Sequence, residues 1–489
     1  MHLTRTALAG IFAVSTLALA ARAQEQLTMA DAVNLALEHN LGLKALRYES
    51  HIAAEEVVIA DAGFDLQLSA GAGTGGAKAA TTGANSGNGS ASAGVTKKIS
   101  TGATLGLCTE LSHDTSFVNG DGAGITASIT QPLLRGAWAD VTLADLRKAR
   151  SSLTAAQLQL RSDTLDLILE VESKYWDLAY AGGNVELMQS SVTAAGRLVE
   201  EVKAKHAAGR ASEVELLESQ ASLAKKESLL TQARQSYSQA ADDLSVLMGN
   251  LLDLGGASYA PAVAALPTDR RPAPEFADAW EKILSEDISG PIQEETIRRA
   301  DLDSLVARSN SRPQLDLSLS GGYSGAGNSE KEARSGLEDR EGHSWNSSLA
   351  FSMPLGRREN IARSRQASAR LEQAKIGLIQ TKQELYRRAR QAWREVAMGV
   401  ERCSSAAAGV EFQARAFEMA RVKYSNGLIT FRELLDAQSD YDTARQENID
   451  AQRDLAIARA AMARLDGTLA STISPETASS IPASPAPTK

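Results

Sequence analysis

Two stretches of the chain match each other: residues 205–220 read KHAAGRASEVELLESQ, and residues 423–438 read KYSNGLITFRELLDAQ. Each stretch ends a helical pattern at a glycine, Gly209 or Gly427, and three residues later a serine or threonine can cap a new helix. A helix that stops at glycine and restarts within a few residues is typical of a tight helical hairpin. The sequence therefore predicts two helical hairpins at equivalent positions of a repeat.

Other landmarks recur in the same order, which indicates that the whole unit is duplicated. Pro132 matches Pro354 at an offset of 222 residues, whereas Leu66 matches Leu317 at an offset of 251 residues. The difference places 29 additional residues in the first copy, between Leu66 and Pro132. These residues are enough for one added strand hairpin.

The duplication predicts the domain organisation. We expect a signal peptide at 1–23, a first repeat at 24–250, a linker at 251–275, a second repeat at 276–470 and a disordered tail at 471–489. In each repeat a helix leads into strands, at 63–131 or 314–354, and then into a long helical hairpin, at 138–249 or 357–468.

The first 23 residues have the pattern of a secretory signal. Arg5 precedes an apolar run over 7–21, and Ala-Arg-Ala stands just before Gln24. The run is shorter than the roughly 20 apolar residues that a spanning helix needs. Without this segment the net charge moves from −9 to −11, because Arg5 and Arg22 are lost, and such a charge argues against nucleic-acid binding. No other long apolar stretch follows, so an exported chain that crosses a membrane would need strands closed into a barrel.

Two long regions without proline, 140–260 and 355–474, predict very long helices. Leucine recurs every seven residues from Leu146 to Leu167, with alanine between, a pattern that favours close, left-handed coiled-coil packing. Shorter helical segments, 28–61 and 276–309, have the length to stack beside the long ones. Both contain a break signal, at 40–42 and at 290–291.

Several short segments alternate apolar and small polar residues with the period of a β-strand. They are 64–70, 104–111, 125–129, 315–320 and 347–353. We expect loops at 71–92 and 325–343, which are rich in glycine and serine or in charge. Alternation over about ten residues fits the wall of a membrane barrel, although the few aromatic residues leave a soluble β-sandwich open.

The chain shows no convincing catalytic or metal-binding set. Residues 71–76, GAGTGG, match a dinucleotide fingerprint, but no helix start follows them to receive a phosphate, so we expect a loop. The six histidines lack metal-ligand spacing, and Cys108 and Cys403 lie far apart in the sequence. We therefore expect no metal, no cofactor and no enzymatic activity.

Three acidic residues follow the glycine turns: Glu215, Glu433 and Asp436. In the first turns of a helix a carboxylate complements the helix dipole, and this is one interpretation. In the other, Glu433 and Asp436 share one helical face and project into a lumen, where assembled copies would form acidic rings that favour cations.

The residues 27–32 (LTMADA), the residues 131–136 (QPLLRG) and the two glycine turns followed by Leu-Leu-x-x-Gln resemble TolC-like outer-membrane efflux channels. The resemblance covers about 28–470. It implies an α+β, mainly helical fold in which long antiparallel coiled-coil hairpins form a periplasmic tunnel. It also implies a short-stranded transmembrane β-barrel of twelve strands shared by a homotrimer.

The function that the resemblance implies is passive transport. Such a channel lies in outer-membrane lipid, extends into the periplasm, and conducts substrates exported by an inner-membrane pump through a periplasmic adaptor, in a tripartite efflux or type I secretion system. Two alternatives are a periplasmic adaptor, which has one coiled-coil hairpin beside a compact β-domain, and a soluble scaffold protein.

The resemblance also assigns roles near the turns. Tyr424 matches a tyrosine that locks the closed periplasmic gate, Glu215 matches its acidic partner, and Glu433 and Asp436 match the acidic rings. An arginine of the family's lock is replaced by Ile429 here.

The turns themselves match the tips that adaptors contact. These tip residues are Gly209 with Arg210, and Gly427 with Leu428. This chain departs from the family at the first tip, where Ala208 and Arg210 replace two hydrophobic residues.

Overall fold

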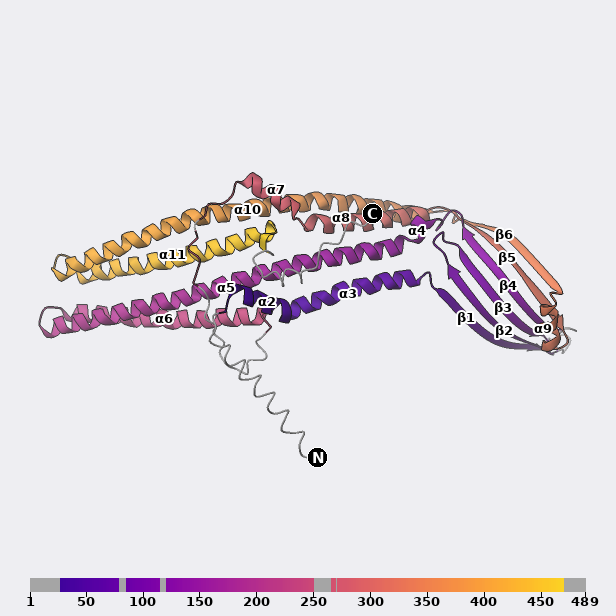
Figure 1. The fold of residues 1–489 in the computed structure, drawn as a ribbon, viewed down its shortest axis with the longest axis horizontal. Coiled ribbons are helices and arrows are strands. Elements are labelled where there is room, and N and C mark those ends of the chain that lie inside the picture. The colour runs from indigo at the N-terminus through magenta and orange to yellow at the C-terminus, as the bar shows by residue number, and fades with distance from the viewer. Residues whose placement is uncertain (1–26, 79–84, 115–119, 250–264, 270, 470–489) are drawn as a thin grey trace, which may run out of the picture. The chain divides into compact units, whose positions relative to one another are not determined.

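The structure, a computed structural model, describes residues 27–78, 85–114, 120–249, 265–269 and 271–469. The expected signal peptide, much of the expected linker and the expected tail lie outside these ranges. The chain divides into two compact units, one of residues 1–48, 159–288 and 382–489 and the other of 49–158 and 289–381 (Figure 1). Each unit takes segments from both sequence repeats.

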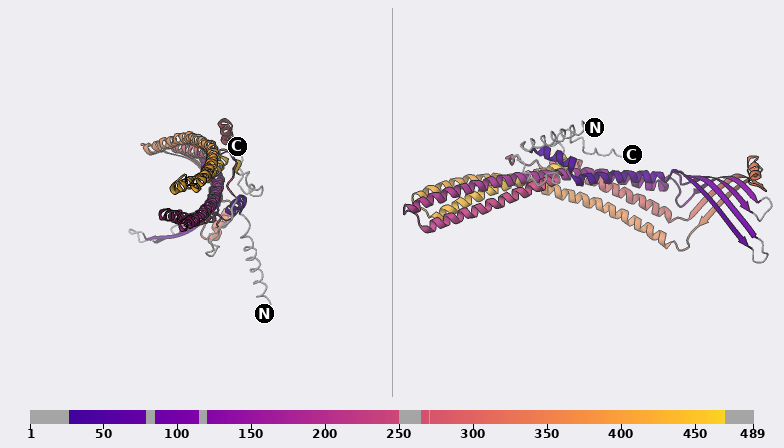
Figure 2. Two further views of the ribbon diagram at one scale, coloured as in Figure 1. Left: turned by 90° about the vertical axis from the view of Figure 1, so that its left-hand side faces the viewer. Right: turned by 90° about the horizontal axis from the view of Figure 1, so that it is seen from below.

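The first unit contains the two helical hairpins. Helix α5 (Ala144–Ala207), which begins in the other unit, turns into α6 (Glu213–Leu247), and α10 (Arg358–Ser425) turns into α11 (Phe431–Leu465). The two hairpins lie side by side in this unit (Figure 2). The expected mainly helical fold with long antiparallel hairpins is confirmed.

The break predicted near residue 40 separates α2 (Met29–His39) from α3 (Leu41–Ala62). Asn40 occupies the break, and its side-chain oxygen accepts a hydrogen bond from the Leu43 N–H at 2.9 Å. Its amide nitrogen donates to the Leu247 carbonyl at 3.0 Å, at the end of α6. Asn40 therefore caps the start of α3 and hydrogen-bonds to the end of α6.

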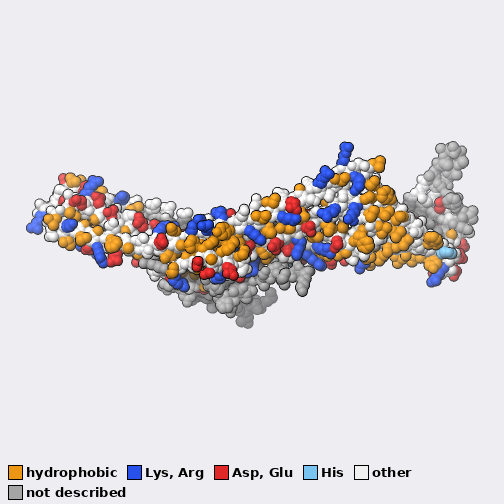
Figure 3. Space-filling model, turned by 90° about the horizontal axis from the view of Figure 1, so that it is seen from above, with side chains coloured by type: hydrophobic (Ala, Val, Ile, Leu, Met, Phe, Trp, Pro, Cys, Tyr) orange, Lys and Arg blue, Asp and Glu red, His pale blue; other side chains and the backbone are white. Residues whose placement is uncertain are grey.

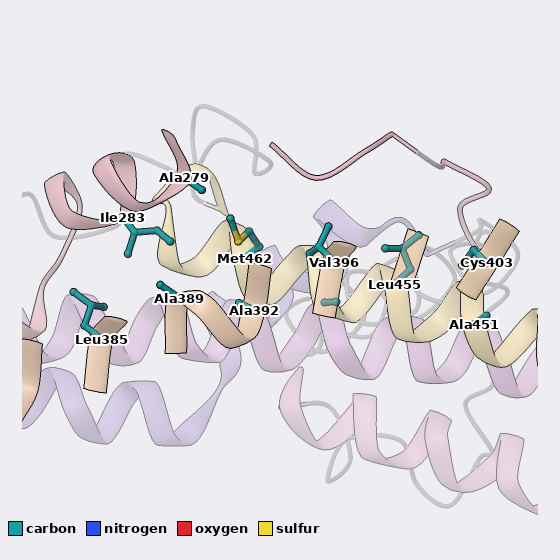
Figure 4. Close-up of a cluster of buried hydrophobic side chains, with 11 residues drawn as sticks. Ala279, Ile283, Leu385, Ala389, Ala392, Val396, Cys403, Ala451, Leu455 and Met462 are labelled. Carbon is teal, nitrogen blue, oxygen red and sulfur yellow. The ribbon is translucent and has the colours of Figure 1, made fainter. Parts of the chain in front are cut away.

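The second short helix, α7 (Phe276–Ser285), is held by a buried apolar cluster (Figure 4). Ile283 is fully buried against α10 and α11. The cluster includes Ala279, Ile283, Leu385, Ala389, Ala392, Val396, Cys403, Ala451, Leu455 and Met462. Small residues alternate with large ones in it, which allows the helices to approach closely.

The second unit contains a six-stranded sheet and the helices that enter and leave it. The strands are β1 (Leu66–Lys78), β2 (Asn85–Lys98), β3 (Thr104–Asp114), β4 (Asp121–Pro132), β5 (Gln314–Gly327) and β6 (Gly342–Ser352). All neighbours are antiparallel, and the order in the sheet follows the chain order. The helices are the short α4 (Ala139–Thr142), most of α3, α8 (Ser289–Asn310) and α9 (Glu330–Glu338), with the first part of α5 and of α10.

Helix α8 packs between the entering parts of the two long helices. Ser151 of α5 donates to the Glu295 carbonyl at 3.1 Å, and Gln293 of α8 donates to the Ala374 carbonyl of α10 at 3.1 Å. Both contacts are side chain to backbone, so they depend little on charge.

The expectation of a loop at 71–92 was wrong, because most of it forms the hairpin of β1 and β2. Ala72 pairs with Ala91 and Gly73 pairs with Ser90 in a continuous antiparallel register. The glycine-rich 71–76 segment is therefore a strand. Its small residues carry almost no hydrophobic pattern, and the backbone pairing with β2 decides their conformation.

The expectation of a loop at 325–343 was also wrong in part. Strand β5 continues to Gly327, and α9 follows within this segment. A side chain on Gly325 would meet the backbone of Ala333 and Leu337 at less than 2.5 Å, so glycine lets the helix approach the strand. This close approach fixes α9 on the sheet.

The two sides of the sheet differ in chemistry. Residues paired across neighbouring strands point to the same side. All large hydrophobic side chains of the strands that are more than a third exposed lie on one side; they are Leu66, Leu68, Leu105, Leu107, Ile125, Leu319, Tyr323, Trp345, Leu349 and Phe351. The other side carries mostly serine, threonine and glycine. Figure 3 shows hydrophobic side chains gathered over the sheet.

Among the described helices, none contains a stretch that is long and apolar enough to span a membrane.

Candidate functional site

The predicted site lies where the two hairpins of the first unit turn. Gly209 has φ +70° and Gly427 has φ +71°, which is the left-handed conformation that glycine adopts without strain. The N–H of Arg210 donates to the Lys205 carbonyl at 2.8 Å, and that of Leu428 donates to the Lys423 carbonyl at 2.9 Å. Both helices therefore end in the same hydrogen-bonded glycine motif.

The helices that follow begin with reciprocal capping. The Ser212 hydroxyl accepts from the Glu215 N–H at 3.2 Å, and the Glu215 carboxylate accepts from the Ser212 N–H at 3.1 Å. Thr430 and Glu433 repeat this arrangement at 3.3 and 2.7 Å. Two of the predicted acidic residues therefore satisfy backbone N–H groups at helix starts.

The capping bonds also set the ionisation of Glu433. Hydrogen bonds from the backbone N–H and the hydroxyl of Thr430 hold the pKa of the Glu433 carboxyl below its usual value. The group is therefore a carboxylate at neutral pH. Asp436 lies one turn further along α11, and both residues are exposed while Leu434 between them is buried.

The structure brings Tyr424 of the second hairpin close to charged residues of the first hairpin. The Lys205 ammonium lies 4.6 Å from the centre of the Tyr424 ring, and it also pairs with Glu201 at 2.9 Å. The Phe431 ring lies 5.6 Å from the tyrosine ring, centre to centre. Phe431 is buried with Val202 in the apolar cluster that joins the two hairpins near their turns.

Tyr424 and Glu215 interact electrostatically. Burial raises the pKa of the Tyr424 hydroxyl above its ordinary value, and the negative charges of Glu215 and then Glu201 raise it further. The hydroxyl therefore stays protonated and can act as a donor at neutral pH. Glu215, the predicted partner, thus acts on Tyr424 through its charge. Glu201 and Lys205 were not predicted, although their spacing of four residues on one helix was a usable signal.

A groove of about 490 Å³ lies beside Tyr424, between α5 and α10. Arg197 and Arg421 line it together with Glu201 and Glu418, so both signs of charge border the groove. The four tip residues are exposed, and Leu428 is 72% exposed. The second tip thus presents an exposed apolar side chain, and the groove beside Tyr424 is bordered by charged side chains.

Further along the hairpins, two polar contacts that the sequence did not predict join them. The Asp442 carboxylate of α11 accepts from Lys226 of α6 and from the Ser191 hydroxyl of α5, each at 2.8 Å. Such charges at packing positions of a coiled coil were the signal that could have indicated a link between helices.

The second contact centres on Tyr180 of α5. Gln446 of α11 donates to its hydroxyl at 2.6 Å, and the Arg453 guanidinium lies 4.9 Å from the ring centre. Burial, with a smaller contribution from Asp450, raises the pKa of Tyr180 to about 12.

Within the described ranges, no three or more His, Cys, Asp or Glu side chains are grouped so that they could hold a metal ion.

Solved structures with a similar fold include two outer membrane channels and an outer membrane protein. The Campylobacter jejuni outer membrane channel CmeC matches with a TM-score of 0.69 at 17% identity, over 90% of this chain and 85% of that chain. The Vibrio cholerae outer membrane protein VceC matches with a TM-score of 0.65 at 18% identity, over 90% of this chain and 96% of that chain. The open state of the Neisseria gonorrhoeae MtrE outer membrane channel matches with a TM-score of 0.64 at 17% identity, over 90% of this chain and 88% of that chain.

The comparison of sequences is more specific than these likenesses of fold. No curated protein sequence matches the chain. The family model described as outer membrane efflux protein matches residues 32–250 and 294–468, which is most of the chain and includes both hairpins. The chain is a member of the outer membrane efflux protein family.

Proposed function

We propose that three copies of this chain form an outer-membrane channel that passively conducts substrates exported by an inner-membrane pump. The sheets of the copies would close into a transmembrane barrel, and the hairpins would form a tunnel through the periplasm to a periplasmic adaptor. The observation that carries the proposal is the two-sided sheet in a member of this family: exposed large apolar side chains on one side, small polar residues on the other. This is the pattern of a barrel wall between lipid and water.

Two neighbouring residues of β6 provide the test. Leu349 lies on the apolar side and is 63% exposed, while Ser348 lies on the polar side. Leu349→Lys should prevent stable insertion into the outer membrane, because a lysine facing lipid costs about 2–4 kcal/mol near the bilayer centre. Ser348→Lys should insert normally. Equal insertion of the two variants, or recovery of the unaltered protein in the soluble periplasm, would overturn the proposal.

The adaptor alternative has less support. An adaptor would have one coiled-coil hairpin beside a compact β-domain, whereas the described part of this chain forms two hairpins and a six-stranded sheet. The family match favours the channel over the adaptor and the scaffold.

For gating, the arrangement around Tyr424 supports a closed state in which the second hairpin rests against the first. Tyr424→Phe keeps the ring on Lys205 and Phe431 but removes the hydroxyl, and Glu215→Gln removes a charge while a glutamine can still cap the helix. The double variant should raise single-channel conductance in lipid bilayers. Unchanged conductance would exclude the lock role of these two residues.

The acidic rings can be tested separately. Glu433→Gln also keeps a side chain that can cap its helix, so a change in conduction would not reflect a frayed helix start. If Glu433 and Asp436 line the lumen, Glu433→Gln with Asp436→Asn should reduce cation preference, measured as the reversal potential in a salt gradient. An unchanged reversal potential would leave Glu433 as a cap alone.

The exposed tips support adaptor contact there. In a background with Cys108→Ser, a cysteine at Arg210 should crosslink to the adaptor in intact cells. The matched control, Lys375→Cys, lies on an exposed part of α10 in the other unit and should not crosslink. A tip cysteine that captures no adaptor would contradict this contact.

A further inference from the structure

The sheet has two edges that the described chain does not cover. Strand β1 pairs with β2, strand β6 pairs with β5, and the order of the six strands places β1 and β6 at the two edges. The edge strands are long, with 13 residues in β1 and 11 in β6. Unpaired N–H and C=O groups along such strands favour pairing with another chain.

We infer that β6 of one copy pairs with β1 of the next, and that three copies close a barrel of eighteen strands. The inference rests on the proposed function for the number of copies. It differs from the twelve strands that the family resemblance implies, because the described residues of each copy supply six strands.

Strand direction supports a second copy as the occupant of each edge. In an antiparallel sheet of six strands in chain order, the first and last strands run in opposite directions. Joining β6 of one copy to β1 of the next therefore continues the antiparallel pattern without a break. The same head-to-tail contact repeats around an axis and closes a ring.

The two additional strands have the chemistry of the wall. The repeat matches Leu66 to Leu317 and Pro132 to Pro354, so β1 and β4 correspond to β5 and β6, and the extra pair is β2 with β3. On the apolar side, Val95 of β2 pairs with Leu107 of β3, and Leu107 pairs with Ala127 of β4. The apolar side is therefore continuous across the added pair.

The opposite side of the added pair is small and polar, like that of its neighbours. Ser92 and Thr96 of β2 lie on this side. On β3, Cys108 pairs with Thr126 of β4 and Gly106 pairs with Ser128 of β4, so these residues lie on the same side. An insertion that folded outside the wall would not need to continue both patterns. The added strands thus widen the arc that each copy supplies.

The consequence is a wider pore through the membrane. Barrel diameter grows roughly in proportion to strand number, so eighteen strands give a diameter about one and a half times that of twelve. Barrels of 16–18 strands leave an aqueous channel. The small polar lining suits hydrated cargo of larger cross-section than a twelve-stranded exit would pass.

Disulfide crosslinking tests which strands meet between copies. Asn346→Cys on β6 is combined with Gln67→Cys, Ser69→Cys or Gly71→Cys on β1, each with Cys108→Ser; all these positions share the polar side. At least one combination should yield covalent oligomers on oxidation. In the control, Asn346→Cys is combined with the native Cys108 of β3. Two strands separate β6 from β3 both within a copy and across the proposed junction, so no crosslink is expected.

The outcomes separate the two proposals. Crosslinks from β6 to β3 in place of β1, or twelve strands counted by electron cryomicroscopy of the protein in lipid nanodiscs, would overturn the eighteen-stranded barrel and leave the channel intact. No intermolecular crosslink and no ring-shaped oligomer would overturn the proposed function as well. Eighteen strands with β6 to β1 crosslinks is the expected result.

A deletion gives an independent readout. Removal of residues 85–114 deletes β2 and β3 and leaves β1 antiparallel to β4, so the two can pair. The variant should assemble with twelve strands and a membrane pore about two thirds as wide, measured by the size of neutral polymers that enter from the strand side. An unchanged polymer cutoff would contradict a wall built from β2 and β3.

Discussion

The Lys226 ammonium lies 2.8 Å from the Asp442 carboxylate, and only 13% and 19% of the two side chains are exposed. Lys226 belongs to the first hairpin and Asp442 to the second, so this ion pair fastens the hairpins to each other. Ser191 donates a further hydrogen bond to the same carboxylate. A largely buried pair of this kind is sensitive to loss of one partner, because the remaining charge keeps its desolvation cost.

Asp442→Ala should therefore lower the free energy of unfolding by about 1.5–3 kcal/mol, the range for a hydrogen bond to a charged group. The measurement is chemical unfolding of the detergent-solubilised protein. Arg363→Ala breaks an ion pair whose side chains are 70% and 74% exposed, and should change stability by about 0–1 kcal/mol. Equal effects of the two variants would contradict the assignment of Asp442 and Lys226 as a buried ion pair that stabilises the contact between the hairpins.

Tyr180 should make stability fall at alkaline pH. Its pKa is raised to about 12 in the fold, from 10.0, so the unfolded chain loses the phenol proton first. The contribution is fully present below pH 10 and is lost as the pH rises toward 12. Tyr180→Phe should flatten the decline in stability between pH 10 and 12. Tyr48→Phe, at a tyrosine that is 69% exposed, is the matched control; an unchanged slope in Tyr180→Phe would refute the prediction.

Gly427→Ala should destabilise the second turn by about 1–2 kcal/mol, because alanine resists the left-handed conformation at φ +71°. Nothing lies within 4 Å of the added Cβ, so the cost is one of backbone conformation alone. Gly409→Ala also meets open space but lies within α10, where alanine favours the helix by up to about 1 kcal/mol. The thermal unfolding temperatures of the two variants should shift in opposite directions. Shifts of the same sign would contradict the role of Gly427 as a left-handed turn residue.

Two adjacent residues of α7 test the cluster in Figure 4. Ile283 is fully buried, and Ile283→Ala should cost about 2–5 kcal/mol of unfolding free energy through lost contacts and a cavity. Leu284 is 51% exposed, and Leu284→Ala should change stability by about 0.5 kcal/mol or less. If both substitutions cost the same, α7 does not pack against α10 and α11 through Ile283.

Local signals predicted the helices and their turns because these depend on neighbouring residues. Gly209 and Gly427 end helices through their own backbone freedom, and Ser212 and Thr430 start the next helices by capping. The break at Asn40 was predictable for the same reason. Heptad spacing likewise indicated coiled-coil packing, since the seven-residue period can be read directly from the sequence.

Strand extent was less predictable, because small residues do not encode it. Residues 71–78 are mostly glycine, alanine and threonine, and they form a strand through hydrogen bonds to β2. The helix α9 depends on the close approach of Gly325 to Ala333, which only the fold reveals. Backbone pairing across the sheet therefore decided what periodicity could not.

The sequence alone determined the duplication, the two capped hairpins and the alternation of most strands, since each depends on residues that are close along the chain. Only the tertiary structure placed Lys205 on the ring of Tyr424 and Lys226 on Asp442, because the partners are more than 200 residues apart. A contact between distant segments depends on how helices pack and align, and no local pattern specifies that alignment.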